Sequence, residues 1–252
     1  MVACRRRLEL QEAKPEGGVE KPRSRAVLCD LGGVVALFDE QKILAKLQGI
    51  AEVSFWEPGV AQRFTELKEL LDRGRISPEE FYRGLKETVG IRVDFPAFAT
   101  VWADNFWPNK EVIAALRALR LHYRVVLISN TDPLHWEFID RSFGIGSLFD
   151  ALVLSYRVGS IKPEPTIYWE ALRAASVGPE HAVLVDDTER NVVAARELGI
   201  HAIHYHPGMD LEKEIHKVFG TLDGTSPCEE PSGASSAAVG TTGDPARPQK
   251  SP

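Results

Sequence analysis

The chain has 252 residues, of which 44% are hydrophobic and 26% charged, so it can bury a sizeable core as one large domain or as a core with a smaller insert. Its formal net charge of -6 argues against nucleic acid as a partner, and no apolar run reaches the roughly 18 residues of a membrane span. The three cysteines are too scattered for a disulfide framework. Taken together, these features lead us to expect a soluble, cytoplasmic protein, a monomer or a dimer, that binds neither nucleic acid nor membranes.

The two ends of the chain differ from its middle in composition. Residues 1–24 are rich in charge, glycine and proline, and residues 221–252 are dominated by serine, glycine, proline, alanine and threonine. Such segments bury too little apolar surface to offset the entropy that is lost on ordering. We therefore expect a disordered tail at each end.

The first predicted strand is the apolar run AVLC at 26–29, which leads directly into Asp30. Continuous apolar runs of this kind indicate strands that are buried on both faces. The next stretch, 36–107, carries helical spacing instead, and one of its helices is expected to begin at Ser77, with Glu80 three residues on. No strand candidate interrupts this stretch. We therefore predict a wholly helical cap at 36–107 that covers the C-terminal edge of the sheet.

Apolar runs and helical patterns alternate in the rest of the folded region. The runs lie at 125–128, 151–154 and 182–185, and the helical patterns at 112–119, 167–174 and 192–198. This alternation is typical of right-handed βαβ units. The predicted fold class is α/β, with a doubly wound parallel sheet formed by residues 25–35 and 108–220.

Polar residues follow the predicted strands at the point where each strand ends. They are Asp30, the pair Ser129-Asn130, and the pair Asp186-Asp187, and Lys162 lies in the proline-rich loop GSIKPEPTIY. Because ligands of open parallel sheets bind beyond the carboxyl ends of the strands, we expect these residues to converge on one site.

Phosphoryl transfer accounts for this combination of residue types. A carboxylate that attacks a phosphate brings like charges to about 4 Å, a repulsion of several kcal/mol that cations must offset. Asp186 and Asp187 beside Asp30 suit Mg²⁺, and Lys162 adds a second positive charge. Ser129 and the amides after it can donate hydrogen bonds to the phosphoryl oxygens. Asp30 is then the predicted nucleophile, which forms an aspartyl-phosphate intermediate.

Four ordered motifs of residues 25–207 resemble those of the haloacid dehalogenase superfamily. They are the nucleophile loop CDLGGV, the serine segment LISNT, the lysine segment IKPEP and the acidic loop VDDTERN. The resemblance implies a Rossmann-like core, a type 1 helical cap, and Mg²⁺ held by Asp30, the carbonyl of Gly32, Asp186 and Asp187.

The same resemblance extends to the residues around the substrate. It implies substrate contacts at Leu31, Ser129, Asn130 and Lys162, and a supporting role for Asn191 at the metal loop. The DLGxV loop and the SNT...LH arrangement are similar to those of sugar-phosphate-type phosphatases. His135, which completes that arrangement, either faces the phosphate site or packs on the helix surface.

Gly32 departs from the pattern of the superfamily. Most of its phosphatases have an aspartate there, which protonates the leaving group, and such acid-base help is worth roughly 10²–10⁴-fold in rate. We therefore expect a slow or leaving-group-selective phosphatase that hydrolyses a small phosphomonoester, with a sugar phosphate among the candidates.

Three other functions stay open at this stage. The first is an inactive or weak phosphate-binding module that serves protein interaction, which Gly32 favours. The second is a dehalogenase, which would not need the pair Asp186-Asp187. The third is a phosphonatase-like enzyme, which would use a cap lysine as a Schiff base; Lys42, Lys46 and Lys68 are available.

Overall fold

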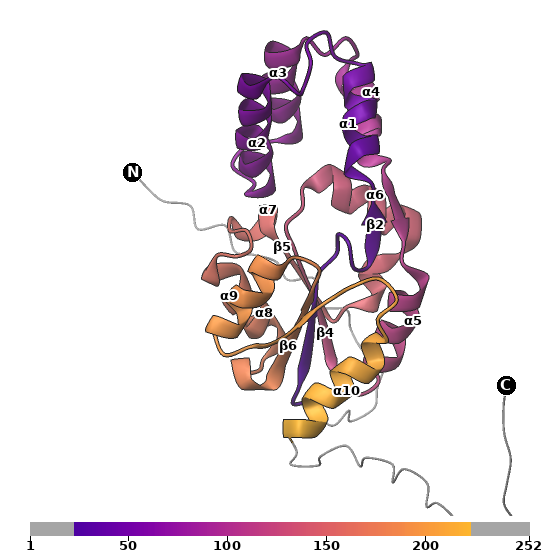
Figure 1. Ribbon diagram of the computed structural model, residues 1–252, viewed down its shortest axis with the longest axis vertical. Helices are drawn as coiled ribbons and strands as arrows, with labels where there is room; N and C mark the ends of the chain where they lie inside the picture. The colour runs from indigo at the N-terminus through magenta and orange to yellow at the C-terminus, as the bar shows by residue number, and fades with distance from the viewer. Residues whose placement is uncertain (1–22, 223–252) are drawn as a thin grey trace, which may run out of the picture.

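The computed structural model describes residues 23–222 and has a five-stranded parallel sheet as its base (Figure 1). The strand order is β5-β4-β1-β6-β7, so β1 lies in the centre, between β4 and β6. The strands are β1 (Ala26–Cys29), β4 (Arg124–Ser129), β5 (Ala151–Leu154), β6 (Ala182–Asp186) and β7 (His201–His204). The predicted doubly wound α/β fold is confirmed.

Helices cover both faces of this sheet, as Figure 1 shows. Successive residues of β1 alternate between the two faces: Val27 and Cys29 pack into one core, and Ala26 and Leu28 into the other. This two-sided burial explains why the strand is a continuous apolar run. The first core contains α5 (Lys110–Leu119), α6 (Pro133–Phe143) and α10 (Leu211–Leu222), and the second contains α8 (Pro165–Ala175) and α9 (Glu189–Glu197).

A separate group of helices lies above the sheet in Figure 1. It consists of α1 (Glu40–Gly49), α2 (Pro58–Asp72), α3 (Pro78–Val89) and α4 (Phe95–Ala103). These helices share a core of their own, in which Leu71, Phe81 and Trp102 are buried. The Ser77 side chain caps α3 and Glu80 completes the capping box, as the sequence predicts. Short helices elsewhere are Ile145–Leu148, α7 (Ser155–Val158) and Pro179–His181.

The prediction of a wholly helical insert is wrong at its two ends. The strands β2 (Ala36–Phe38) and β3 (Phe106–Pro108) pair there as an antiparallel ribbon. Each has three residues, which is too short to show the alternation that identifies a strand in a sequence. The ribbon forms the connection between the sheet and the cap.

The two tails expected at 1–24 and 221–252 lie outside the described residues, apart from their inner ends at 23–24 and 221–222. Within 23–222, none of the helices combines the length and the apolar character that a membrane crossing requires.

Candidate active site

The polar residues that follow the strands meet in one cavity of about 510 Å³. Asp30 follows β1, Ser129 is the last residue of β4, and Asp187 follows β6. These three residues line the cavity together with Lys162, which lies in the loop between α7 and α8. Because β1 lies between β4 and β6, the sheet order alone brings these strand ends together. The convergence that the sequence predicts is therefore present.

Lys162 forms the centre of the site. Its ammonium group lies 2.8 Å from Oδ1 of Asp30 and 2.6 Å from Oδ2 of Asp186, and the side chain is only 1% exposed. Burial alone would lower the pKa of Lys162, but the two adjacent carboxylates hold it above its usual value. Lys162 is therefore a fixed positive charge.

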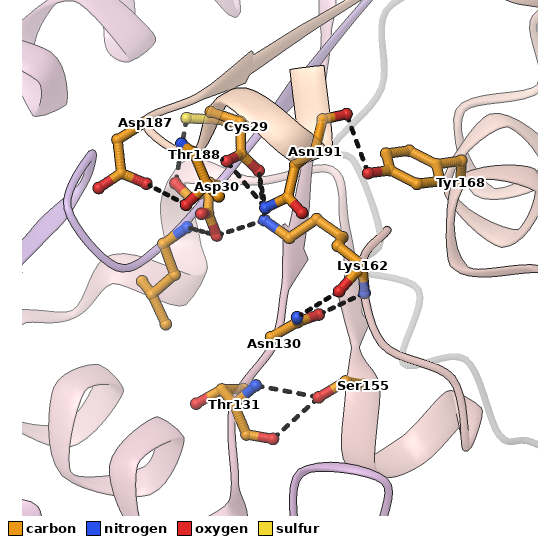
Figure 2. Close-up of polar contacts among 12 residues, drawn as sticks. Cys29, Asp30, Asn130, Thr131, Ser155, Lys162, Tyr168, Asp187, Thr188 and Asn191 are labelled. Carbon is orange, nitrogen blue, oxygen red and sulfur yellow. Dashed lines mark hydrogen bonds and ion pairs between the residues drawn. The ribbon is translucent and has the colours of Figure 1, made fainter. Parts of the chain in front are cut away.

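The loop that carries Lys162 is fastened to the end of β4 by Asn130. The Asn130 side chain accepts a hydrogen bond from the Lys162 amide at 2.7 Å and donates one to the Lys162 carbonyl at 3.0 Å, as Figure 2 shows. Both polar atoms of the Asn130 side chain are thereby used. This residue positions Lys162, and its main-chain amide is the group that remains for a ligand.

Asp186 is held from three directions. Besides Lys162, its carboxylate accepts hydrogen bonds from the Thr188 amide at 2.9 Å and from Nδ2 of Asn191 at 3.0 and 3.2 Å. The carbonyl of Asn191 in turn accepts a hydrogen bond from the Tyr168 hydroxyl (Figure 2). The supporting position predicted for Asn191 is thus at the carboxylate of Asp186.

Three carboxylates lie together at this site, and two of them, Asp30 and Asp186, contact Lys162. Oxygen atoms of Asp30, Asp186 and Asp187 lie within 4.8 Å of one another. Burial raises the pKa of Asp30 and that of Asp187, and the neighbouring Asp186 charge raises both further, against the lowering effect of Lys162. When all three carboxylates are ionised, the charge of Lys162 leaves two negative charges uncompensated. A hard divalent cation with oxygen ligands, such as Mg²⁺, fits this donor set.

Gly33 allows the acidic loop to approach the nucleophile loop. Its φ is +74°, and a Cβ atom built on it would lie 1.8 Å from Oδ2 of Asp187. No other residue fits this position without displacing that carboxylate. The neighbouring Gly32 has no such constraint, because a Cβ atom there would meet only the Phe38 ring, at 3.2 Å.

On the cap side of the cavity, His135 bridges the core and the cap. Its Nδ1 lies 2.9 Å from Oδ2 of Asp132 and its Nε2 lies 3.0 Å from the carbonyl oxygen of Trp102. Each ring nitrogen of His135 thus has an oxygen partner, one at the start of the core helix α6 and one on the cap helix α4. Burial would raise the pKa of Asp132, but the adjacent His135 holds it well below its usual range. His135 thus lines the cavity, and its two nitrogens are engaged in joining the cap to the core.

A second connection joins the cap to the loop of Lys162. Arg73, at the end of α2, forms a forked pair with Glu164, with Nη1 at 2.9 Å and Nη2 at 2.5 Å from the carboxylate oxygens. Glu164 also accepts a hydrogen bond from Ser160 at 2.7 Å. Next to Arg73 in the sequence, a Cβ atom on Gly74 would lie 2.1 Å from the carbonyl oxygen of Tyr156, so the backbones of the cap and of α7 are in close contact there.

Sequence reasoning missed these cap-to-core contacts. Nothing in the sequence pairs Arg73 with Glu164, because the two lie 91 positions apart. Asp132 gave one signal, since an aspartate before Pro133 is typical of a helix start, and its carboxylate does accept from the amides of Leu134 and His135.

Comparisons with known proteins identify the family of the chain. Residues 24–199 match the family model of haloacid dehalogenase-like hydrolases. The chain is 28% identical over 210 residues to D-ribitol-5-phosphate phosphatase of Bacteroides thetaiotaomicron, an alignment that covers 77% of this chain and 98% of the relative. It is also 23% identical over 202 residues to a sesquiterpene phosphatase of Aspergillus oryzae, covering 78% of this chain and 97% of that protein.

A solved structure shares the architecture. The structure of a HAD family enzyme from Bacteroides thetaiotaomicron, in complex with magnesium and inorganic phosphate, superposes with a TM-score of 0.67 at 27% identity. The match covers 75% of this chain and 98% of that one. The family model matches residues 24–199, well over half of the chain, so the chain belongs to the haloacid dehalogenase-like hydrolases.

Proposed function

We propose that this hydrolase is a magnesium-dependent phosphatase that cleaves a small phosphomonoester through an aspartyl-phosphate on Asp30. The observation that carries the proposal is the group of three carboxylates, Asp30, Asp186 and Asp187, of which two contact the buried Lys162. A reaction at carbon, as in a dehalogenase, would not call for this excess of negative charge. The relative solved with magnesium and phosphate supports the same chemistry.

In the first step an Asp30 oxygen attacks phosphorus, and the bond from phosphorus to the ester oxygen breaks. Asp30 is oriented by the Leu31 amide, which donates to its Oδ1 at 2.6 Å, and by Lys162. Lys162, the Ser129 hydroxyl and the Asn130 amide bind the phosphoryl oxygens. Water then attacks the aspartyl-phosphate, which releases inorganic phosphate and restores the carboxylate.

The bound metal would be held by Asp30, Asp187 and the carbonyl of Gly32, with Asp186 in support, and it supplies positive charge to the phosphoryl oxygens. The Asp186 carboxylate is already engaged by Lys162, Thr188 and Asn191, which leaves Asp187 as the better direct ligand. This assignment rests on the contacts of the described residues.

Gly32 supplies no side chain that could give a proton to the departing oxygen. The leaving group therefore takes its proton from water or from the substrate itself, and a good leaving group reacts fastest. The phosphonatase-like alternative is not supported. Among the cap lysines at 42, 46 and 68, all in the described region, Lys68 alone lines the cavity, and its ammonium group is paired with Asp72 at 2.6 Å. A lysine whose nitrogen is held in that pair is not placed to act as a nucleophile.

The substrate is a small phosphorylated metabolite. The similarity to D-ribitol-5-phosphate phosphatase supports a sugar-type phosphate, and the similarity to a sesquiterpene phosphatase supports an apolar one. Either kind of substrate would place its phosphate group at the same residues of this site.

The proposal is tested by the Mg²⁺-dependent hydrolysis of 4-nitrophenyl phosphate. Asp30→Asn is nearly isosteric and is expected to abolish turnover, whereas the matched control Asp104→Asn, at an exposed position of the cap, is expected to retain it. Excess chelator is expected to stop the native protein. Absence of turnover by the native protein with Mg²⁺ present would favour the non-catalytic phosphate-binding module.

A further inference from the structure

We infer that the alcohol part of the substrate is apolar, an alkyl, prenyl or aryl group rather than a polyol. This inference rests on the proposed phosphatase function and concerns the half of the same cavity that lies beyond the phosphate site. The walls of that half come from the ribbon β2-β3 and from the cap helices α1, α2 and α4.

Aromatic rings form a continuous lining of this half. The Phe38 and Phe106 rings of the ribbon lie 5.7 Å apart, and Phe106 meets the His135 ring edge-on at 4.9 Å. On the other side of His135, the Trp102 ring stacks at 4.7 Å, and Phe64 of α2 packs against Trp102 at 6.2 Å. All five side chains line the cavity.

Aliphatic side chains of α1 extend the apolar lining. Ile43 and Leu44 are half-buried and face the cavity. Ile43 also packs against the core of the cap, whereas Leu44 is not among the side chains that pack against the described cores. Leu44 is therefore free to contact a ligand, and a change there leaves the described cores intact.

Two polar side chains of this half, those of His135 and Lys68, are already engaged by other groups of the protein. Both nitrogens of His135 are used by Asp132 and by the carbonyl of Trp102. The ammonium group of Lys68 is used by both carboxylate oxygens of Asp72, each at 2.6 Å. A polyol that entered this chamber would give up hydrogen bonds to water without finding replacements, which is costly for each hydroxyl group.

Besides Ser129 of the phosphate half, three polar side chains of the lining have no such engagement among the described contacts. Glu40 and Arg190 are exposed, so they stay hydrated and select little between ligands. Thr131 is buried and offers a single hydroxyl group beside the phosphate site. The cavity thus suits one polar substituent near the phosphate and an apolar body beyond it.

Binding of non-hydrolysable phosphonates separates the two classes of alcohol. Hexylphosphonate and the phosphonate analogue of ribitol 5-phosphate are titrated calorimetrically into the full chain with Mg²⁺ present. Burial of two methylene groups is enough for roughly tenfold tighter binding, so hexylphosphonate is expected to bind at least about tenfold more tightly. Equal affinity, or tighter binding of the polyol analogue, would overturn the inference.

A pair of substitutions locates the effect in the chamber. Leu44→Gln keeps the length and helix propensity of the side chain and is expected to reduce the preference for hexylphosphonate several-fold. Leu70→Gln, a control on α2 at a leucine that is 37% exposed and does not line the cavity, is expected to leave the preference unchanged. An unchanged preference in the folded Leu44→Gln protein would contradict the inference.

The two failures are distinguishable. Loss of the proposed function is reported by the absence of Mg²⁺-dependent 4-nitrophenyl phosphate turnover, whereas loss of this inference is reported by the phosphonate affinities of a protein that does turn over that ester.

Discussion

Gly32→Asp places a carboxylate two residues after the proposed nucleophile Asp30, where the resemblance to the superfamily implies a general acid. The backbone of Gly32 is not left-handed, so an L side chain is compatible with its conformation. The new Cβ atom would lie 3.2 Å from Cε1 of Phe38, and that ring must give way by a few tenths of an ångström. A local overpacking of this size costs about 1 kcal/mol of stability, which a folded protein tolerates.

The expected gain concerns the substrates that need a proton most. General acid catalysis contributes roughly 10²–10⁴-fold, or about 3–5 kcal/mol of the activation barrier. Alkyl phosphates have poor leaving groups and would gain most of this, whereas aryl phosphates with acidic phenols would gain little. The dependence of kcat on leaving-group pKa is therefore expected to be steep in the native chain and flatter in Gly32→Asp.

The assay is kcat for a series of aryl and alkyl phosphates at saturating Mg²⁺. Gly59→Asp is the matched control. Its Cβ would have no neighbour within 4 Å, and it lies in the first turn of α2 and does not line the cavity. The control is expected to keep the native slope. Equal slopes in folded, active native and Gly32→Asp proteins would refute the reasoning, since another group would then already supply the proton.

Three further predictions follow from the contacts of the site. Asp187→Ala is expected to weaken Mg²⁺ binding with little loss of stability. Asp186→Ala removes one partner of the buried Lys162 and is expected to cost about 3 kcal/mol of unfolding free energy in urea. A larger stability loss in Asp187→Ala, with weaker Mg²⁺ binding in Asp186→Ala, would contradict the ligand assignment. Because the pKa of metal-free Asp30 is raised, Mg²⁺ binding is expected to release a proton and to weaken as the pH falls from neutral toward the usual aspartate range. Calorimetry in two buffers of different ionisation enthalpy measures this proton release, and a release of none would contradict the prediction. The half-exposed pair of Arg73 and Glu164 is expected to show a coupling of about 0.2–1 kcal/mol in a double-mutant cycle of alanine variants. A coupling indistinguishable from zero would mean that the pair does not hold the cap.

The centre of the sheet was predictable because β1, β4 and β6 are buried along almost their whole length, whereas the edge strand β7 is only half-buried and forms no apolar run. The runs at 26–29 and 151–154 match β1 and β5 residue for residue, since a strand covered by helices on both sides has no polar positions to interrupt it. The short strands β2 and β3 were not predictable for the converse reason. Each has three residues, most of them only partly buried. They pair because the cap returns the chain to the sheet close to where it left.

The convergence of the residues in the proposed phosphate half of the site was also predictable from the sequence. These residues follow strands whose order brings their ends together, so that position in the chain determines position in space. The other half is built by tertiary contacts. The engagement of His135 by Asp132 and Trp102, and the packing of Phe38 beside Gly32, depend on how the cap sits on the sheet, which local patterns do not encode.

The most direct test of the proposed mechanism is to identify the residue that carries the phosphoryl group during turnover. The native protein with Mg²⁺ is mixed with 4-nitrophenyl phosphate, quenched in acid within the first turnover, digested, and analysed by mass spectrometry. The account predicts one phosphoryl group on the peptide that contains Asp30, and none on that peptide in Asp30→Asn. Release of 4-nitrophenol in the first turnover with the phosphoryl group found on another residue, or on none, would contradict it.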